Sequence, residues 1–157
     1  MSINYGVADL ISNMIELEKC GGEFYSALAA KHSNPLIKQL FAKLAEQENK
    51  HRVIYERLLK KEEPELGEID DESQDYLREI INQKFDLDIQ HALTNSSPQE
   101  VLDMAVKLEN DSIKFINAFG VLTRTAYRDL VEQIKKQEQG HLEMLLDMKK
   151  NTEVCKE

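Results

Sequence analysis

The sequence predicts an all-α protein in which four long helices form an antiparallel bundle of two helical hairpins joined by one long crossover. Three observations lead to this fold class. Apolar residues recur with the helical period along nearly the whole chain. Proline residues at helix starts, together with glycine and proline beyond helix ends, divide this pattern into two pairs of long helices. Between the pairs, from residue 62 to residue 96, the pattern is interrupted by an acidic stretch.

The first hairpin is predicted over residues 4–61. Its first helix runs from about Asn4 to Lys31, and its second begins at Asn34-Pro35, which supply an N-cap and a first-turn proline. The short link between them implies that the two helices are antiparallel. The inward positions of the first helix are Val7, Leu10, Met14, Leu17, Gly21, Phe24 and Leu28. Those of the second are Leu36, Leu40, Leu44, Ile54, Leu58 and Leu59.

The crossover over residues 62–96 has a different character. Residues 62–75, EEPELGEIDDESQD, have no apolar face and are expected to be exposed to solvent. A shorter helix is expected from about Ser73. Residues 85–89, FDLDI, alternate with period two, which is compatible with a brief extended segment but does not decide the structure there.

The second hairpin is predicted over residues 97–150, followed by a polar tail at 151–157. Ser97-Pro98-Gln99-Glu100 has the pattern of a capping box with proline in the first turn, so a helix begins there. We expect this third helix to end near Phe119, with Gly120 as the residue just after it. The fourth helix begins near Thr123 or Thr125 and ends at about Lys150. The whole chain, residues 1–157, is expected to form one domain.

Composition excludes several classes of protein. The net charge of −9 argues against nucleic acid or an anionic membrane as a partner, since both attract clustered Lys and Arg. No segment approaches the roughly 20 apolar residues of a membrane span. Cys20 and Cys155 form neither a disulfide framework nor a zinc pattern, and the N-terminus does not resemble a signal peptide. We therefore expect free thiols and a cytoplasmic protein.

The two predicted hairpins are related by an internal repeat. At an offset of 91 residues, Ile15, Leu17, Glu18 and Phe24 align with Val106, Leu108, Glu109 and Phe115. At an offset of 90, Leu40, Leu44, Gln47, Glu48 and His51 align with Leu130, Ile134, Gln137, Glu138 and His141. Apolar positions of two helices can match by chance. Charged residues within apolar stripes should not, so the repeated irregularity itself indicates a site.

Six polar residues of the repeat lie on stripes where burial is expected: Glu18, Glu48, His51, Glu109, Glu138 and His141. An unpaired buried carboxylate costs several kcal/mol, or takes up a proton, and four together would also repel each other. Two divalent cations would balance the four negative charges. Glutamate and histidine three residues apart share one helix face, so both can point to the bundle axis. One Glu-x-x-His alone would favour a solvated helix face, but two inward copies, each with a partner glutamate, favour a two-metal site.

The segments that carry the repeat resemble rubrerythrin-like proteins. ELEKCGGEFYSALA and LAEQENKH resemble the first half of such proteins, and KLENDSIKFINAF and KKQEQGH resemble the second. The set of six ligands is also similar to that of bacterioferritin. The resemblance implies a ferritin-like fold and a di-iron centre. It also implies that Glu18 and Glu109 are terminal ligands, that Glu48 and Glu138 bridge the metals, and that His51 and His141 each bind one metal.

Two departures from the rubrerythrin pattern limit what the resemblance implies. Rubrerythrins carry a further carboxylate one turn after the glutamate of the third helix, where this chain has Ser112, so their ligand exchange is not expected here. The sequence also contains no Cys-x-x-Cys pair, so we expect no rubredoxin-like domain. Electrons would come from an external donor protein or from ferrous iron itself.

The resemblance leads us to expect an oxidoreductase, peroxidase- or ferroxidase-like, that reduces O2 or peroxide at two iron ions. Manganese or zinc are alternative metals for the same ligand set. The alternative functions are a ferroxidase that feeds iron storage and a non-catalytic metal-binding bundle. We expect a homo-oligomer and favour a dimer. A storage shell would instead need a large assembly.

Other residues near the expected site have two interpretations each. Tyr25, two turns after Glu18, either donates a hydrogen bond to a ligand carboxylate, as its counterpart does in ferritin-like relatives, or is an ordinary core tyrosine. Tyr55 and Tyr127 are expected in the core. Gly21 and Gly22 indicate either a close approach of two helices or room for a small molecule beside the metals.

Overall fold

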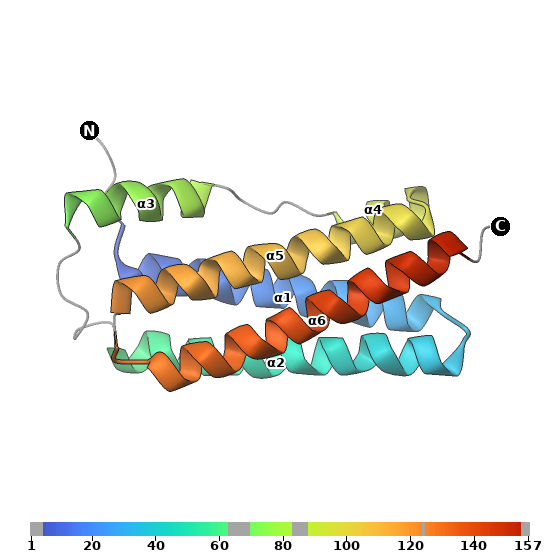
Figure 1. The fold of residues 1–157 in the computed structure, drawn as a ribbon, viewed down its shortest axis with the longest axis horizontal. Helices are drawn as coiled ribbons and strands as arrows, with labels where there is room; N and C mark the ends of the chain where they lie inside the picture. Colours follow the sequence, from blue (N-terminus) through green and yellow to red (C-terminus); the bar gives the residue numbers. More distant parts are fainter. Residues whose placement is uncertain (1–4, 63–69, 83–87, 124, 155–157) are drawn as a thin grey trace.

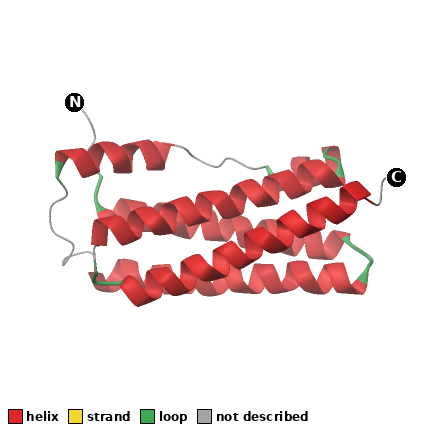
Figure 2. Ribbon diagram, viewed as in Figure 1, coloured by secondary structure: helices red, strands yellow, loops and turns green. Residues whose placement is uncertain are grey.

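The protein is described here by a computed structural model that covers residues 5–62, 70–82, 88–123 and 125–154. Within these ranges the regular structure is entirely helical (Figures 1 and 2). The helices are α1 (Val7–Lys31), α2 (Pro35–Glu62), α3 (Asp71–Asn82), α4 (Ile89–Asn95), α5 (Pro98–Thr123) and α6 (Arg128–Val154). The predicted all-α class, with two hairpins and a long crossover, is confirmed.

The four long helices lie side by side along the bundle (Figure 1). α1 and α2 are antiparallel, and so are α5 and α6. α2 and α5 run in the same direction, because the crossover with α3 and α4 carries the chain back along the length of the bundle before α5 begins. This topology places the two repeated hairpins face to face, so that the repeated polar residues of both can meet inside.

The predicted starts of α2 and α5 are confirmed by their capping contacts. The Asn34 side-chain oxygen accepts a hydrogen bond from the Leu36 N–H at 2.9 Å, at the N-terminus of α2. At the start of α5, the Glu100 N–H donates to Ser97 Oγ at 3.2 Å, and the Ser97 N–H donates to Glu100 Oε1 at 3.1 Å. This is the reciprocal pair of a capping box, which satisfies two N–H groups that the helix itself leaves unpaired.

The predicted end of the third helix is wrong. α5 continues through Gly120 to Thr123, and α6 begins only at Arg128. A Cβ atom at Gly120 would lie 3.1 Å from a methyl carbon of Val131 on α6. Gly120 therefore allows the two helices of the hairpin to approach closely. In the sequence, a glycine needed for this packing looks the same as a glycine that ends a helix.

The predicted inward face of the second helix is wrong at its N-terminal end. Leu36 is 76% exposed, whereas Phe41 is buried at 1%. From Phe41 onward the buried positions include Leu44, Glu48 and Tyr55, so the stripe is displaced by about one residue near the helix start.

The crossover is more helical than predicted. α3 begins at Asp71, two residues before the expected start, and α4 (Ile89–Asn95) was not predicted. Asp88 caps α4 by accepting a hydrogen bond from the His91 N–H at 3.1 Å, so Asp88 and Ile89 belong to a helix start. The other residues of the period-two segment, 85–87, lie outside the described residues, as does most of the acidic stretch at 63–69.

The core is built mainly from the inward faces of α1, α2, α5 and α6. Every predicted inward residue of α1 is buried. The largest fully buried side chains include Phe24, Tyr25, Phe41, Tyr55 and Phe119. None of the helices in the described ranges is long and apolar enough to cross a membrane.

Candidate metal centre

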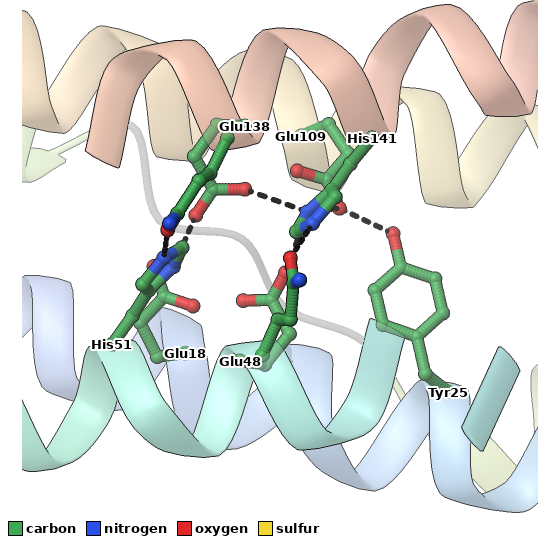
Figure 3. Close-up of polar contacts among 9 residues, drawn as sticks. Glu18, Tyr25, Glu48, His51, Glu109, Glu138 and His141 are labelled. Carbon is green, nitrogen blue, oxygen red and sulfur yellow. Dashed lines mark hydrogen bonds and ion pairs between the residues drawn. The ribbon is translucent and has the colours of Figure 1, made fainter. Parts of the chain in front are cut away.

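Six buried polar residues meet in the middle of the bundle, contributed by all four long helices (Figure 3). Each has an exposed fraction of 5% or less. They are Glu18 on α1, Glu48 and His51 on α2, Glu109 on α5, and Glu138 and His141 on α6. These are the six positions that the repeat predicts to point inward. The helical period places each residue on the inward face, and the facing hairpins bring the faces together.

The six residues form two overlapping groups. Glu18, Glu48, His51 and Glu138 make the first group, and each offers one ligand atom within 4.8 Å of the others. In the second group, Glu109 and His141 replace Glu18 and His51 at the same limit of 4.8 Å. Glu48 and Glu138 therefore belong to both groups. Each group contains three carboxylates and one imidazole, a set of hard oxygen donors with one nitrogen donor that suits iron, manganese or zinc.

Several polar atoms of the cluster have no hydrogen-bond partner within the described part of the chain. They are Oε2 of Glu18, Oε2 of Glu109, Oε2 of Glu138 and Nδ1 of His141. An unsatisfied buried polar group costs about 1–3 kcal/mol, and a charged one costs more. A cation bound between these atoms would satisfy them together, so the residues present fit a metal centre.

The electrostatics of the metal-free cluster are those of crowded acids. Burial raises the pKa of Glu18 well above its usual value, and the charges of Glu138 and Glu109 raise it further. Burial and the neighbouring Glu138 carboxyl raise the pKa of Glu109 to about 8. Burial also disfavours the charged form of Glu138, yet its contacts with Glu109, His141 and His51 outweigh burial and lower its pKa. Protons therefore replace part of the positive charge that cations would supply.

The histidine rings face the carboxylates through Nδ1. The distance from His51 Nδ1 to Glu138 Oε1 is 2.9 Å, and that from His141 Nδ1 to Glu138 Oε2 is 3.3 Å. Burial alone would lower the pKa of His141, but its contacts with Glu109 and Glu138 outweigh burial and raise that pKa to about 9. Each imidazole thus directs the same nitrogen at the shared carboxylate Glu138.

Tyr25 reaches the cluster from α1. Its side chain is fully buried, and its O–H donates a hydrogen bond of 2.7 Å to Glu109 Oε1 (Figure 3). Burial and the charge of Glu109 raise the pKa of Tyr25, so the phenol keeps its proton and remains a donor. The structure therefore has the hydrogen bond from Tyr25 to a cluster carboxylate, which was the first of the two interpretations of this residue.

Two further side chains contact the cluster, and the sequence assigned them no role. Gln47 on α2 hydrogen-bonds His141 on α6, and Gln137 on α6 hydrogen-bonds His51 on α2. The signal that could have found them was present in the sequence, because Gln47 and Gln137 align in the repeat at an offset of 90.

The close approach of α1 and α2 explains the two neighbouring glycines. A Cβ atom at Gly21 would lie 3.2 Å from Glu48 Oε2, and one at Gly22 would lie 3.0 Å from Asn49 Oδ1. The sequence offered a close approach of helices or room for a small molecule, and the structure has the close approach. At Gly21, the group that occupies the space of the missing side chain is a carboxylate of the cluster itself.

Replacing Gly21 with valine is expected to weaken metal binding although no cluster residue is changed. The added side chain would need the space of the Glu48 carboxyl group, whose Cδ would lie 3.3 Å from the new Cβ. Overpacking of this kind costs about 1–3 kcal/mol, which corresponds to a loss of affinity of about tenfold or more. Calorimetric titration of the metal-free protein with Mn²⁺ or Zn²⁺ measures this loss of affinity.

The matched control is Gly140→Val on α6, because no atom of the described residues lies within 4 Å of a Cβ at Gly140. This variant is expected to bind metal like the unchanged protein, although Gly140 is next to His141 in the chain. Equal affinity losses in the two variants would show that the effect comes from replacing a helical glycine and not from displacing Glu48.

The remaining candidates contribute no ligand atom to either group. His32 caps the end of α1 and stacks on Phe41 with ring centroids 5.5 Å apart. His91 is exposed on α4. Tyr55 is buried, as predicted, while Tyr127 is only partly buried. Ser112, where rubrerythrins carry a further carboxylate, is buried on α5 at 7% exposure.

Comparisons with known proteins agree with the helical architecture. The sequence profile of the family Rubrerythrin matches residues 9–149. Among solved structures, a protein from Thermotoga maritima described as a ferritin-like diiron-carboxylate protein is similar at 28% identity. The match covers 97% of this chain and 99% of that one, with a TM-score of 0.71. The predicted ferritin-like fold is thereby confirmed. No protein with a curated description matches the chain.

Proposed function

The chain belongs to the rubrerythrin family, and from this premise we propose that it is a di-iron oxidoreductase that reduces O2 or peroxide. The observation that carries the proposal is the pair of overlapping groups at the centre of the bundle, each with its own histidine and both sharing Glu48 and Glu138. A similar structure described as ferritin-like and diiron-carboxylate supports iron as the metal.

The proposed roles follow from membership of the two groups. Glu48 and Glu138, which belong to both, would bridge two ions. Glu18 and His51 would complete one ion, and Glu109 and His141 the other. The four carboxylates would balance the charge of two ferrous ions. Two ferrous ions supply two electrons, the number that reduces one peroxide molecule to water.

The chain's own residues keep this centre dry and ordered. The six residues are almost completely buried, so their charges are not screened by water and act strongly on a bound ion. The Tyr25 hydroxyl holds one oxygen of Glu109 by a hydrogen bond of 2.7 Å. The electron donor would be a separate protein or ferrous iron itself. A dimer remains our proposal for the assembly.

The test of the function combines metal analysis with rapid oxidation. Iron-reconstituted protein is expected to contain two irons per chain. When it is kept anaerobic in the ferrous form and mixed with peroxide, absorbance of the ferric product should appear rapidly, with one peroxide consumed per two irons. The control is His51→Ala, which should lose one iron and the rapid phase.

Three results would contradict the proposed function. Clearly less than one metal per chain after reconstitution would overturn the metal centre. Two bound irons that oxidise no faster than free Fe²⁺ would indicate a non-catalytic bundle. Size-exclusion chromatography separates the proposal from an iron-storage shell, since a shell requires a large assembly.

Replacing Tyr25 with phenylalanine is expected to weaken the Glu109 side of the centre while the fold persists. The ring keeps its packing, but Glu109 Oε1 loses its donor at 2.7 Å. Loss of a partner that orients a metal ligand typically costs about 10–100-fold in affinity or activity. Metal titration and stopped-flow oxidation of the ferrous protein measure both.

The control for this change is Tyr55→Phe, because Tyr55 is equally buried on α2 and, within the described ranges, donates no hydrogen bond to a cluster carboxylate. Equal losses in the two variants would mean that the Tyr25 hydroxyl has no special role.

A further inference from the structure

Two glutamines join the hairpins across the face formed by α2 and α6. Gln137 Oε1 on α6 lies 2.7 Å from Nε2 of His51 on α2. Gln47 Oε1 on α2 contacts Nε2 of His141 on α6 in the same way. The arrangement is reciprocal, because each glutamine precedes the glutamate of one Glu-x-x-His motif and contacts the histidine of the other.

We propose that Gln47 and Gln137 are positioning residues that hold His141 and His51, respectively, with Nδ1 directed at the carboxylate cluster. The inference rests on the proposed metal function, because it assigns to each histidine the nitrogen that would bind an ion. What it adds is the pair of glutamine side chains that determines which nitrogen of each histidine is free to bind.

The selection follows from the chemistry of imidazole. A neutral ring carries its proton on one nitrogen and a free lone pair on the other. A carbonyl oxygen accepts only from an N–H group, so Gln Oε1 at Nε2 keeps the proton there and leaves Nδ1 as the electron donor. The reverse orientation of the amide would place its NH2 group at Nε2 and favour protonation of Nδ1, which would block metal binding.

On the other side of each ring, Nδ1 faces the carboxylates of the cluster. In the metal-free protein such a contact holds a proton on Nδ1, which a bound ion would displace. His51 Nδ1 lies 2.9 Å from Glu138 Oε1 and 3.8 Å from Glu18 Oε1. Within the described residues His141 Nδ1 is buried without a hydrogen-bond partner, and it lies 3.3 Å from Glu138 Oε2 and 3.6 Å from Glu109 Oε1. Partners behind metal-binding histidines commonly fix the tautomer and ring orientation in this manner.

A neutral amide suits this position because the cluster already contains four carboxylates. Glutamate in place of glutamine would also accept from Nε2–H, so it should preserve the ring orientation. It would add negative charge close to the centre, which favours the more positive, oxidised metal. Glutamine provides the acceptor without that charge.

The reciprocal contacts predict a crossed effect on the two histidines, which ordinary packing would not produce. Changing Gln137 on α6 should disturb His51 on α2 and leave His141, its neighbour four residues along α6, unchanged. Changing Gln47 should disturb His141 and leave His51 unchanged. Since Gln137 is exposed and Gln47 is half-buried, leucine at either position should leave the core packing as it is.

The experiment uses zinc-loaded protein labelled with ¹⁵N at histidine, because Zn²⁺ suits the ligand set and is diamagnetic. In the unchanged protein, long-range ¹H–¹⁵N spectra should show both rings protonated at Nε2 with slow proton exchange. Gln137→Leu should shift and accelerate the exchange of the His51 Nε2–H only, and should weaken one zinc site about 10-fold or more. Gln47→Leu should do the same to His141.

Three further variants complete the design. Gln139→Leu, at an exposed position on α6, is the control and should change neither histidine. Gln137→Glu should restore the slow exchange at His51 and the zinc affinity that leucine loses. In iron-loaded protein, the same glutamate variant should lower the reduction potential.

The inference is overturned if Gln137→Leu leaves His51 and both zinc affinities unchanged, or if it disturbs His141 in place of His51. Protonation of Nδ1 in the zinc-loaded protein would overturn it equally. If the unchanged protein binds no metal, the proposed function fails. The crossed effects of the two leucine variants on the histidine signals are then measured in the metal-free protein, where their absence would refute the glutamine contacts separately.

Discussion

Replacing Glu48 with alanine is expected to reduce the metal content from two ions per chain to at most one, while the metal-free bundle remains folded. Glu48 belongs to both groups of the cluster, so its loss should affect both ions at once. In the metal-free state the same change removes a buried carboxylate from a site that holds three others, which relieves repulsion. Elemental analysis after iron reconstitution and thermal unfolding of the metal-free protein measure the two effects.

Two companion variants separate charge from volume and from position. Glu48→Gln removes the charge but keeps the size of the side chain, so it should lose metal without leaving a cavity beside Gly21. Glu46→Ala, two residues away, changes a carboxylate whose side chain is 65% exposed and pairs with Lys50. This control should keep two ions. If the metal-free Glu48 variants unfold, Glu48 is a structural residue and the proposed two-metal centre loses its main support.

In the metal-free protein, the free energy of unfolding is expected to fall as pH rises from about 5 to about 9. The pKa of Glu109 is about 8 in the folded chain against an ordinary 4.5, so the folded state holds a proton that the unfolded state has released. The pKa of His141 is about 9 against 6.5, and its stabilising effect is likewise lost as pH rises through 9. Each pKa unit corresponds to about 1.4 kcal/mol, so the total loss should be on the order of several kcal/mol.

Glu138 does not reverse this trend within the stated range. Its pKa is lowered in the folded chain, so its contribution is complete above its ordinary value of 4.5 and is lost only as pH falls below that value. Chemical unfolding of chelator-treated protein at several pH values between 5 and 9 measures the slope. Protein saturated with Mn²⁺ should show a much smaller slope between pH 7 and pH 9, because cations then replace the protons. A metal-free protein that gains stability over this range would contradict the crowded-acid description of the cluster.

The helices and the inward position of the six polar residues could be predicted from the sequence, because both depend on local periodicity. Every residue of the predicted stripe on α1 is buried, and the caps at Asn34 and Ser97 form as expected. The repeat added the decisive information, since polar residues that recur in two apolar stripes must serve a shared purpose. Local signals were insufficient at Gly120, where a glycine needed for packing against Val131 resembled a helix end.

What only the tertiary structure decided is how these faces are oriented toward one another. The sharing of Glu48 and Glu138 between two groups, the hydrogen bond from Tyr25 to Glu109, the space for Glu48 at Gly21 and the crossed glutamine–histidine contacts all join different helices. Periodicity fixes the angle of a side chain around its own helix axis. It contains no information on how far one helix slides or rotates against another, which depends on how the side chains of all four helices pack together.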